Sequence, residues 1–264
     1  LADRRVLDDR QRRRVLVVLR AGRGHVDPQV ACDHDRRLEL LVRMHPATQL
    51  GGQISRKGDP VPLDGEVDVE GRLAQQHVAH RSAFGGLLSD KPLMQNVVAD
   101  LAVESEAATA LGLRLAAAVD AAHDPHEAAL RRIALPLAKF WVCKRTPMMV
   151  AEALECLGGN GYVEESGLPR LYREAPLNSV WEGSGNVNAL DVLRALSREP
   201  EVLEAWITEV GLARGADRRL DRAVDETLAL LGDAATLESS ARRLAGRMAT
   251  CLQGSLLVRF APPE

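Results

Sequence analysis

The sequence is poor in aromatic residues, which make up 3% of its 264 positions, and none of them precedes Phe84. Aromatic side chains usually supply much of the buried area of a protein core. Residues 1–71 are instead dense in Arg, Asp, Gly and Val, with 13 basic and 12 acidic residues. They therefore predict a weak folding unit, with one short strand at 15–19 and one short helix at 37–44.

The chain also lacks an initial methionine, because it begins with Leu1. This start and the composition of residues 1–71 predict that the segment is a fragment, or a stretch read from a wrong start or frame. Its basic run at 10–14 follows Asp8 and Asp9, and such mixed charge runs are usually solvated. We therefore interpret the run as a solvated segment in preference to a nucleic-acid arm.

The four cysteines, at positions 32, 143, 156 and 251, include no CxxC pair. Their spacing fits neither a zinc site nor a disulfide framework, so we expect no metal and reduced thiols in a cytoplasmic protein. No apolar run approaches the ~20 residues of a membrane span, so no membrane partner is expected. The net charge of −3 gives no general attraction for nucleic acid or an anionic membrane.

After residue 71 the sequence predicts helices almost throughout. Apolar residues recur at helical spacing over residues 93–119. Asp90 is expected to cap this helix, with Pro92 in its first turn. Asp124 and Pro125 are expected to end it.

A second long helix is expected to end at the glycine-rich stretch 158–161, where the chain needs positive φ. Pro136 and Pro147 fall inside this helix and should kink or split it. Further helices are expected at 185–196, 201–210, 217–231 and 234–258. The fold class is therefore mainly α: an antiparallel helical bundle over 72–197, additional helices over 198–264, and an irregular N-terminal segment over 1–71.

One carboxylate stands out between two of these helices, in the run Trp181-Glu182-Gly183-Ser184. A large aromatic residue precedes Glu182, and two small residues follow it. Burial beside the indole would raise the pKa of this carboxyl and suit it to act as a base. The alternative interpretation is a first-turn helix residue that the helix dipole favours.

Residues 72–264 resemble the C-terminal helical domain of the acyl-CoA dehydrogenase family, whose three landmarks occur here in the family's order. The run RSAFG at 81–85 resembles the family's R-x-x-F-G segment, and ECLGGNGY at 155–162 resembles its Q-x-x-G-G-x-G-[FY] turn. WEGSGN at 181–186 resembles its [YW]-E-G-[ST] signature. The run EESGLPRLYRE at 164–174 is most similar to the branch of adaptive-response, DNA-alkylation-associated proteins of the AidB type.

The resemblance implies an FAD-dependent enzyme that dehydrogenates an acyl-CoA thioester between its α and β carbons. Glu182 occupies the position of the family's base, which removes the α-proton while the flavin N5 takes the β-hydride. The positions that match the family's FAD contacts are Arg81, Phe84, Gly158, Gly159, Trp181, Gly183, Ser184 and Asn186. The resemblance does not identify the electron acceptor.

In the family pattern, FAD bridges two subunits, so the resemblance implies a homodimer or a homotetramer. The family also places an N-terminal helical domain and a β domain before this region, and residues 1–71 show neither pattern. We therefore expect the chain to be part of a longer enzyme, with an incomplete active site of its own.

Two other functions stay open. The first is an alkylation-response protein that binds double-stranded DNA and keeps vestigial dehydrogenase activity, which would need a positive surface. Residues 197–264 hold 9 arginines and 11 acidic residues, so a salt-bridged solvent face with Asp217, Asp221 and Asp225 is the preferred interpretation. The candidate DNA-binding stripe is Arg214, Arg218, Arg219, Arg222, Arg242, Arg243 and Arg247. The second is a non-enzymatic helical oligomerisation remnant.

Overall fold

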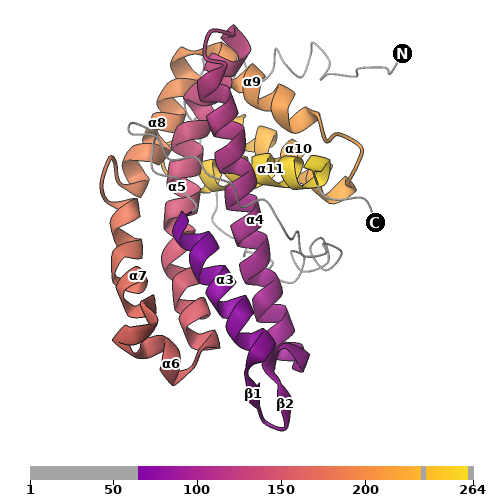
Figure 1. The fold of residues 1–264 in the computed structure, drawn as a ribbon. Coiled ribbons are helices and arrows are strands. Elements are labelled where there is room, and N and C mark those ends of the chain that lie inside the picture. The colour runs from indigo at the N-terminus through magenta and orange to yellow at the C-terminus, as the bar shows by residue number, and fades with distance from the viewer. Residues whose placement is uncertain (1–64, 233–235, 261–264) are drawn as a thin grey trace. The chain divides into compact units, whose positions relative to one another are not determined.

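The computed structural model describes residues 65–232 and 236–260, with side chains from Gly71 onward. The strand expected at 15–19, the helix expected at 37–44 and Cys32 lie outside these residues. The described part of the chain is almost entirely helical, which confirms the mainly α prediction (Figure 1). No described helix combines the length and the apolar character that a membrane span requires.

The described residues form two compact units, which we call the hairpin unit (65–112 and 142–178) and the C-terminal unit (113–141 and 179–259). The hairpin unit contains α3 (Gly65–His80), β1 (Ser82–Ala83), β2 (Gly86–Leu87), η1 (Leu88–Asp90), the first part of α4 (Pro92–Asp120), the last part of α5 (Pro125–Cys156), α6 (Gly159–Tyr162), η2 (Glu164–Ser166), α7 (Leu168–Glu174) and most of η3 (Ala175–Ser179). The C-terminal unit contains the remainder of α4 and α5, with α8 (Gly185–Arg198), α9 (Pro200–Gly211), α10 (Arg218–Leu231) and α11 (Ala241–Phe260), whose last residue lies outside it.

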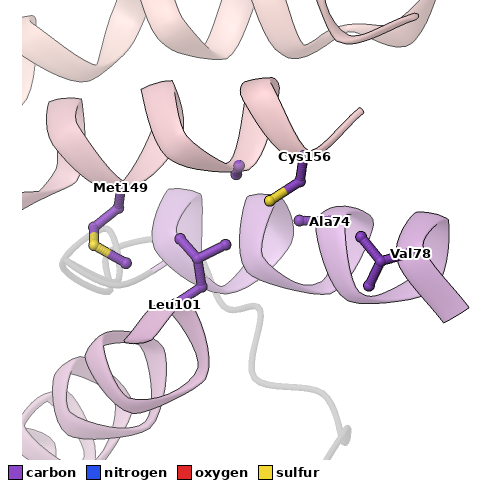
Figure 2. Close-up of a cluster of buried hydrophobic side chains, with 6 residues drawn as sticks. Ala74, Val78, Leu101, Met149 and Cys156 are labelled. Carbon is purple, nitrogen blue, oxygen red and sulfur yellow. The ribbon is translucent and has the colours of Figure 1, made fainter. Parts of the chain in front are cut away.

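The core of the hairpin unit brings three helices together (Figure 2). Ala74 and Val78 of α3 stand one helical turn apart and belong to the same buried cluster as Leu101 of α4 and as Met149 and Cys156 of α5. Burial of these side chains away from water is the main favourable term that holds the helices together. The α3 helix that completes this core begins at Gly65, before the predicted boundary at residue 72.

The C-terminal unit is built around α9, α10 and α11. Trp206 of α9 is fully buried, and its indole N–H donates to the carbonyl of Met248 on α11 at 3.2 Å. A glycine lets α11 approach its neighbours, because a Cβ on Gly246 would lie 2.9 Å from the indole of Trp141. The buried faces of the last two helices are formed by Leu220, Val224, Leu228 and Leu231 of α10, and by Leu244, Met248, Leu252 and Leu256 of α11.

Two helices are capped by aspartates at their N-termini. Asp124 accepts hydrogen bonds from the backbone N–H groups of His126 and Glu127, at 2.8 and 3.1 Å, at the start of α5. Asp217 accepts from the N–H groups of Arg219 and Leu220 at the start of α10. Each carboxylate satisfies amides that have no partner within the helix, and it lies at the positive end of the helix dipole.

The structure corrects three local predictions. The second long helix is not split, because α5 runs unbroken from Pro125 to Cys156 through Pro136 and Pro147. Its long buried face offsets the hydrogen bonds that the prolines remove. A cap from Asp90 is also wrong, since this residue ends η1 and Lys91 precedes α4.

The last helix begins later than predicted, at Ala241 rather than at residue 234. The hydroxyl groups of Ser239 and Ser240 both donate to the carbonyl of Thr236, at 3.0 and 2.7 Å. Serine side chains that bond to nearby backbone groups compete with helix formation. This competition explains why 236–240 forms turns instead of the first turn of α11.

Candidate functional site

The predicted catalytic residue lies in a tight turn immediately before α8. Glu182 has φ of +54° and Gly183 has φ of +110°, so two consecutive residues adopt positive φ. A non-glycine residue in the left-handed region costs roughly 1–2 kcal/mol. Ser184 then returns to extended backbone, with φ of −65° and ψ of 168°, and occupies the N-cap position of α8. The backbone is therefore strained at Glu182, the residue that is predicted to act as the base.

Neither Glu182 nor its aromatic neighbour is buried. Glu182 is exposed, and Trp181 keeps 47% of its surface exposed. The expectation of a carboxylate buried beside an indole is therefore wrong for this chain taken by itself. The reason is local: the left-handed turn holds both residues on the surface before α8 begins.

The backbone of this turn requires glycine at position 183. At φ of +110°, side chains with a Cβ are strained, and a Cβ here would lie 3.3 Å from Asn188 Nδ2 and 3.4 Å from Val187 Cγ1. The side chain of Asn188 donates to the carbonyl of Gly183 at 2.7 Å and to that of Ser184 at 3.1 Å. Asn188 is not among the predicted site residues. An amide side chain in the first turn of the helix after Glu182 is a local signal for it, which Asn188 shares with Asn186.

Asn186, a predicted cofactor contact, is bound by a residue from a distant part of the sequence. Arg242 on α11 donates from Nη1 to Asn186 Oδ1 at 3.3 Å. The guanidinium of Arg242 also lies 5.8 Å from the centre of the Phe140 ring, within the range of a cation–π interaction. The amide oxygen of Asn186 is thus engaged by the protein, which orients its amide nitrogen as the group that remains for a ligand.

Arg81 and Phe84 lie on the β1–β2 hairpin. The strands pair antiparallel, with Ser82 opposite Leu87 and Ala83 opposite Gly86. Phe84 is at the tip with φ of +51°, and its side chain is 91% exposed. Lys91 Nζ donates to the carbonyl of Phe84 at 3.0 Å, which ties the tip to the start of α4.

The side chain of Arg81 is exposed, and it forms no ion pair with Asp90 within the described part of the chain. Its backbone is fixed, because the Arg81 amide donates to His77 O and its carbonyl accepts from Leu88 N, both at 2.9 Å. A rigid backbone, with a guanidinium that has no carboxylate partner among the described residues, suits a residue that binds an anionic group.

The glycines in the turn after α5 serve different purposes: one allows positive φ and another allows close packing. Gly158 has φ of +59°, which meets the predicted positive φ, and a Cβ on Gly158 or Gly159 would have no atom within 4 Å. Gly161 is buried, and a Cβ there would lie 2.3 Å from the carbonyl oxygen of Leu154. Gly161 is therefore required by packing, whereas Gly159 borders open space.

The predicted site residues are divided between the two units. Residues 181–186 share one turn in the C-terminal unit. In the hairpin unit, Arg81 and Phe84 lie at the hairpin, and Gly158 and Gly159 lie at the end of α5.

The arginines of α10, of α11 and of the turn before α10 mostly bond to neighbouring side chains. Arg214 bonds to Asp225 at 2.7 Å, Arg219 to Asp217 at 2.8 Å, and Arg247 to Glu226 at 2.5 Å. Arg218, Arg222 and Arg243 are exposed. The pairs match the salt-bridged solvent face that the sequence analysis prefers to a DNA-binding stripe.

Comparison with known proteins gives the same assignment as the landmarks. Residues 68–197 match a family model described as "Acyl-CoA dehydrogenase, C-terminal domain". The Escherichia coli protein AidB is 43% identical over 191 residues, which cover 72% of this chain and 35% of AidB. Acyl-CoA dehydrogenase family member 11 of Caenorhabditis elegans is 33% identical over 216 residues, which cover 72% of this chain and 34% of that protein.

A solved structure agrees with the sequence matches. The crystal structure of Caenorhabditis elegans ACDH-11 in complex with C11-CoA is similar to this chain with a TM-score of 0.67 and 29% identity, over 74% of this chain and 37% of that one. The chain thus spans about a third of the length of the curated relatives it matches. The predicted resemblance, including its AidB-type branch, is confirmed for the part of the chain that these matches cover.

Proposed function

Because the chain belongs to the acyl-CoA dehydrogenase family through residues 68–197, we propose that it is the C-terminal part of an FAD-dependent enzyme that dehydrogenates acyl-CoA thioesters. One observation carries this proposal. Phe84 and Glu182 are the two non-glycine residues with positive φ in the described part of the chain, and the family resemblance selects both on independent grounds. Backbone strain at functional residues persists because the surrounding structure holds it in place, and it concentrates at active sites and ligand clamps.

In the proposed reaction, the Glu182 carboxylate takes the α-proton of the thioester. That proton is weakly acidic, so the base must be close to it and shielded from water. Glu182 is exposed in this chain, and the proposal therefore places it against substrate and against further protein surface in the complete enzyme. The left-handed turn presents the carboxylate outward for such a contact. FAD, when bound, supplies the acceptor for the β-hydride.

The residues present are compatible with FAD. The open space beside Gly158 and Gly159 allows a group from outside the chain to approach the backbone closely. The Ser184 hydroxyl makes no capping bond to α8, so it is available to a ligand at the positive end of that helix. Arg81 would contribute a positive charge for the pyrophosphate. These residues would bind and orient the cofactor, and Asn186 would add an amide donor.

The proposal also includes a second copy of the chain. Phe84 places an almost fully exposed aromatic ring at the hairpin tip, and such a ring is a suitable anchor for another protein surface. A homodimer or homotetramer, with FAD shared between subunits, would cover it. The acyl-CoA substrate class is supported by the C11-CoA complex of the related Caenorhabditis elegans structure. We place the enzyme in the cytoplasm.

The first test is the visible absorbance spectrum of the purified 264-residue protein after FAD is added and the excess is removed. A retained and perturbed flavin spectrum is expected, and a colourless protein would contradict FAD binding by this chain. The second test is turnover of acyl-CoA with an artificial electron acceptor. Glu182→Gln should abolish turnover while FAD stays bound.

The matched control is Glu201→Gln. Glu201 is an exposed carboxylate in the first turn of α9, whereas Glu182 lies before the N-cap of α8 and is not a first-turn residue as the alternative interpretation has it. Equal effects of the two substitutions on turnover would assign the loss to surface charge and contradict a catalytic role for Glu182. A protein that is colourless and inactive but assembles into oligomers would favour the non-enzymatic remnant. Tight duplex-DNA binding with a steep salt dependence would favour the alkylation-response function.

A further inference from the structure

The backbone conformation of the turn at Glu182 is one that glutamate itself disfavours. Glu182 and Gly183 both have positive φ, and a glutamate adopts this region only when other contacts hold it there. The Ser184 side chain makes no capping bond. The contact that restrains the turn therefore has to come from another residue.

Asn188 provides that contact. Its Nδ2 donates to Gly183 O at 2.7 Å and to Ser184 O at 3.1 Å, and its own backbone N–H donates to Ser184 O at 3.0 Å. The residue is half-buried in the first turn of α8, a helix of 14 residues. One rigid element thus binds both carbonyl groups that follow Glu182, and it fixes the direction in which the chain leaves the glutamate.

We propose that Asn188 is a positioning residue for Glu182, acting through the carbonyl groups of Gly183 and Ser184. The proposal rests on the proposed function, in which Glu182 is the base. Without the two bonds the turn relaxes toward conformations with negative φ at Glu182, and the carboxylate leaves the place from which it reaches the α-proton. Misplacement of a catalytic group by about 1 Å can lower the rate by roughly a hundredfold.

Asn188→Asp is the sharpest variant, because it keeps the shape of the side chain and replaces the amide donor with an acceptor. An ionised carboxylate beside two carbonyl oxygens repels them instead of binding them. Asn188→Gln is the conservative variant, since it keeps the amide donor on a side chain one methylene longer. Asn96→Asp, at an exposed position of α4, is the matched control for the added charge.

Two measurements on the FAD-loaded full chain test the proposal. The first is steady-state turnover of acyl-CoA. We expect kcat of Asn188→Asp to fall by at least about tenfold with KM changed by less than about threefold, as for a group that acts mainly in the transition state. Asn188→Gln should recover part of the loss, and Asn96→Asp should behave like the unmodified chain.

The second measurement is amide hydrogen exchange over residues 181–188, which needs no catalytic activity. Loss of the two bonds should speed exchange in this segment by at least about tenfold in Asn188→Asp, with exchange elsewhere in α8 and α9 unchanged. A general loss of structure would instead speed exchange throughout both helices. Such a loss would overturn the local role that we assign to Asn188.

The outcomes separate this proposal from the proposed function. If Glu182→Gln abolishes turnover but Asn188→Asp retains full kcat and normal exchange, the positioning role is overturned and the function stands. If the unmodified chain turns over acyl-CoA and Glu182→Gln does so at the same rate, the proposed function fails, and the catalytic role of Asn188 fails with it. Faster exchange in Asn188→Asp would then show only that Asn188 restrains the turn.

Discussion

Arg114 and Glu209 lie 95 positions apart in the sequence and form two hydrogen bonds, from Arg114 Nε to Oε1 at 3.0 Å and from Nη2 to Oε2 at 2.9 Å. Arg259 donates to the same carboxylate at 2.7 Å, and Glu127 accepts from Arg114. Only 3% of the Glu209 side chain is exposed. α4, α5, α9 and α11 are therefore joined inside the C-terminal unit by a buried charge cluster in which every carboxylate faces an arginine.

The pKa of Glu209 is shifted by opposing effects. Burial by itself raises the pKa, because it disfavours the charged form. The hydrogen bonds and positive charges of Arg114 and Arg259 outweigh burial, so the pKa of Glu209 lies below its usual value. A group whose pKa is lowered in the folded state stabilises the fold at a pH above its unfolded pKa, and this contribution is lost as the pH falls through the folded value.

The first prediction follows from the lowered pKa of Glu209. The free energy of unfolding should fall as the pH drops below about 4.3, the unfolded pKa of a glutamate. Glu209→Gln should lower the free energy of unfolding by about 1–3 kcal/mol at neutral pH, since a neutral amide replaces the buried carboxylate to which Arg114 and Arg259 donate. The variant should also lose part of the acid dependence. Urea unfolding at a series of pH values measures both effects, with the exposed Glu201→Gln as control.

The second prediction concerns strain at Glu182. Glu182→Gly should keep or raise the free energy of unfolding, by at most about 1 kcal/mol, because glycine adopts positive φ without steric cost but gains entropy in the unfolded chain. The same variant should lose acyl-CoA turnover. Phe84→Gly, at the other strained position, should behave similarly in urea unfolding. A marked destabilisation of Glu182→Gly would show that the turn is not strained as described.

The third prediction tests two roles of glycine in the turn after α5, which are close packing at Gly161 and access for a cofactor at Gly159. Gly161→Ala should destabilise the hairpin unit by more than about 2 kcal/mol, since its Cβ would overlap the carbonyl oxygen of Leu154. Gly159→Ala should leave thermal unfolding almost unchanged, because its Cβ would meet no atom within 4 Å. If FAD approaches the backbone there, Gly159→Ala should weaken FAD binding several-fold. Normal FAD affinity in a stable Gly159→Ala variant would contradict the assignment.

The fourth prediction uses two neighbouring arginines of α11. Arg242→Ala removes the hydrogen bond to Asn186 and the cation–π contact with Phe140, so FAD affinity should fall several-fold. Arg243→Ala is the matched control, since Arg243 is exposed on the same helix and should leave the affinity unchanged. Fluorescence titration with FAD measures both variants. Equal losses would indicate a general charge effect instead of an oriented amide.

Much of the fold could be predicted because its signals are local. The helix break at Asp124 and Pro125, the proline at the start of α9 and the periodic apolar residues of α10 each act within a few residues of sequence. The prediction was wrong where long-range packing competes with a local rule. The buried face of α5 keeps this helix continuous through Pro136 and Pro147, and its apolar residues are stabilised by partners from other parts of the chain.

The candidate site divides in the same way. The sequence by itself determined which residues carry the chemistry, because the order of Glu182, Gly183 and Ser184 is a motif of adjacent positions. Tertiary structure decided how those residues are held: the exposure of Glu182 and the contact of Asn186 with Arg242, 56 positions away. The physical reason is that backbone strain and side-chain orientation depend on which distant groups the fold brings within hydrogen-bonding distance, and no local pattern in the sequence encodes that.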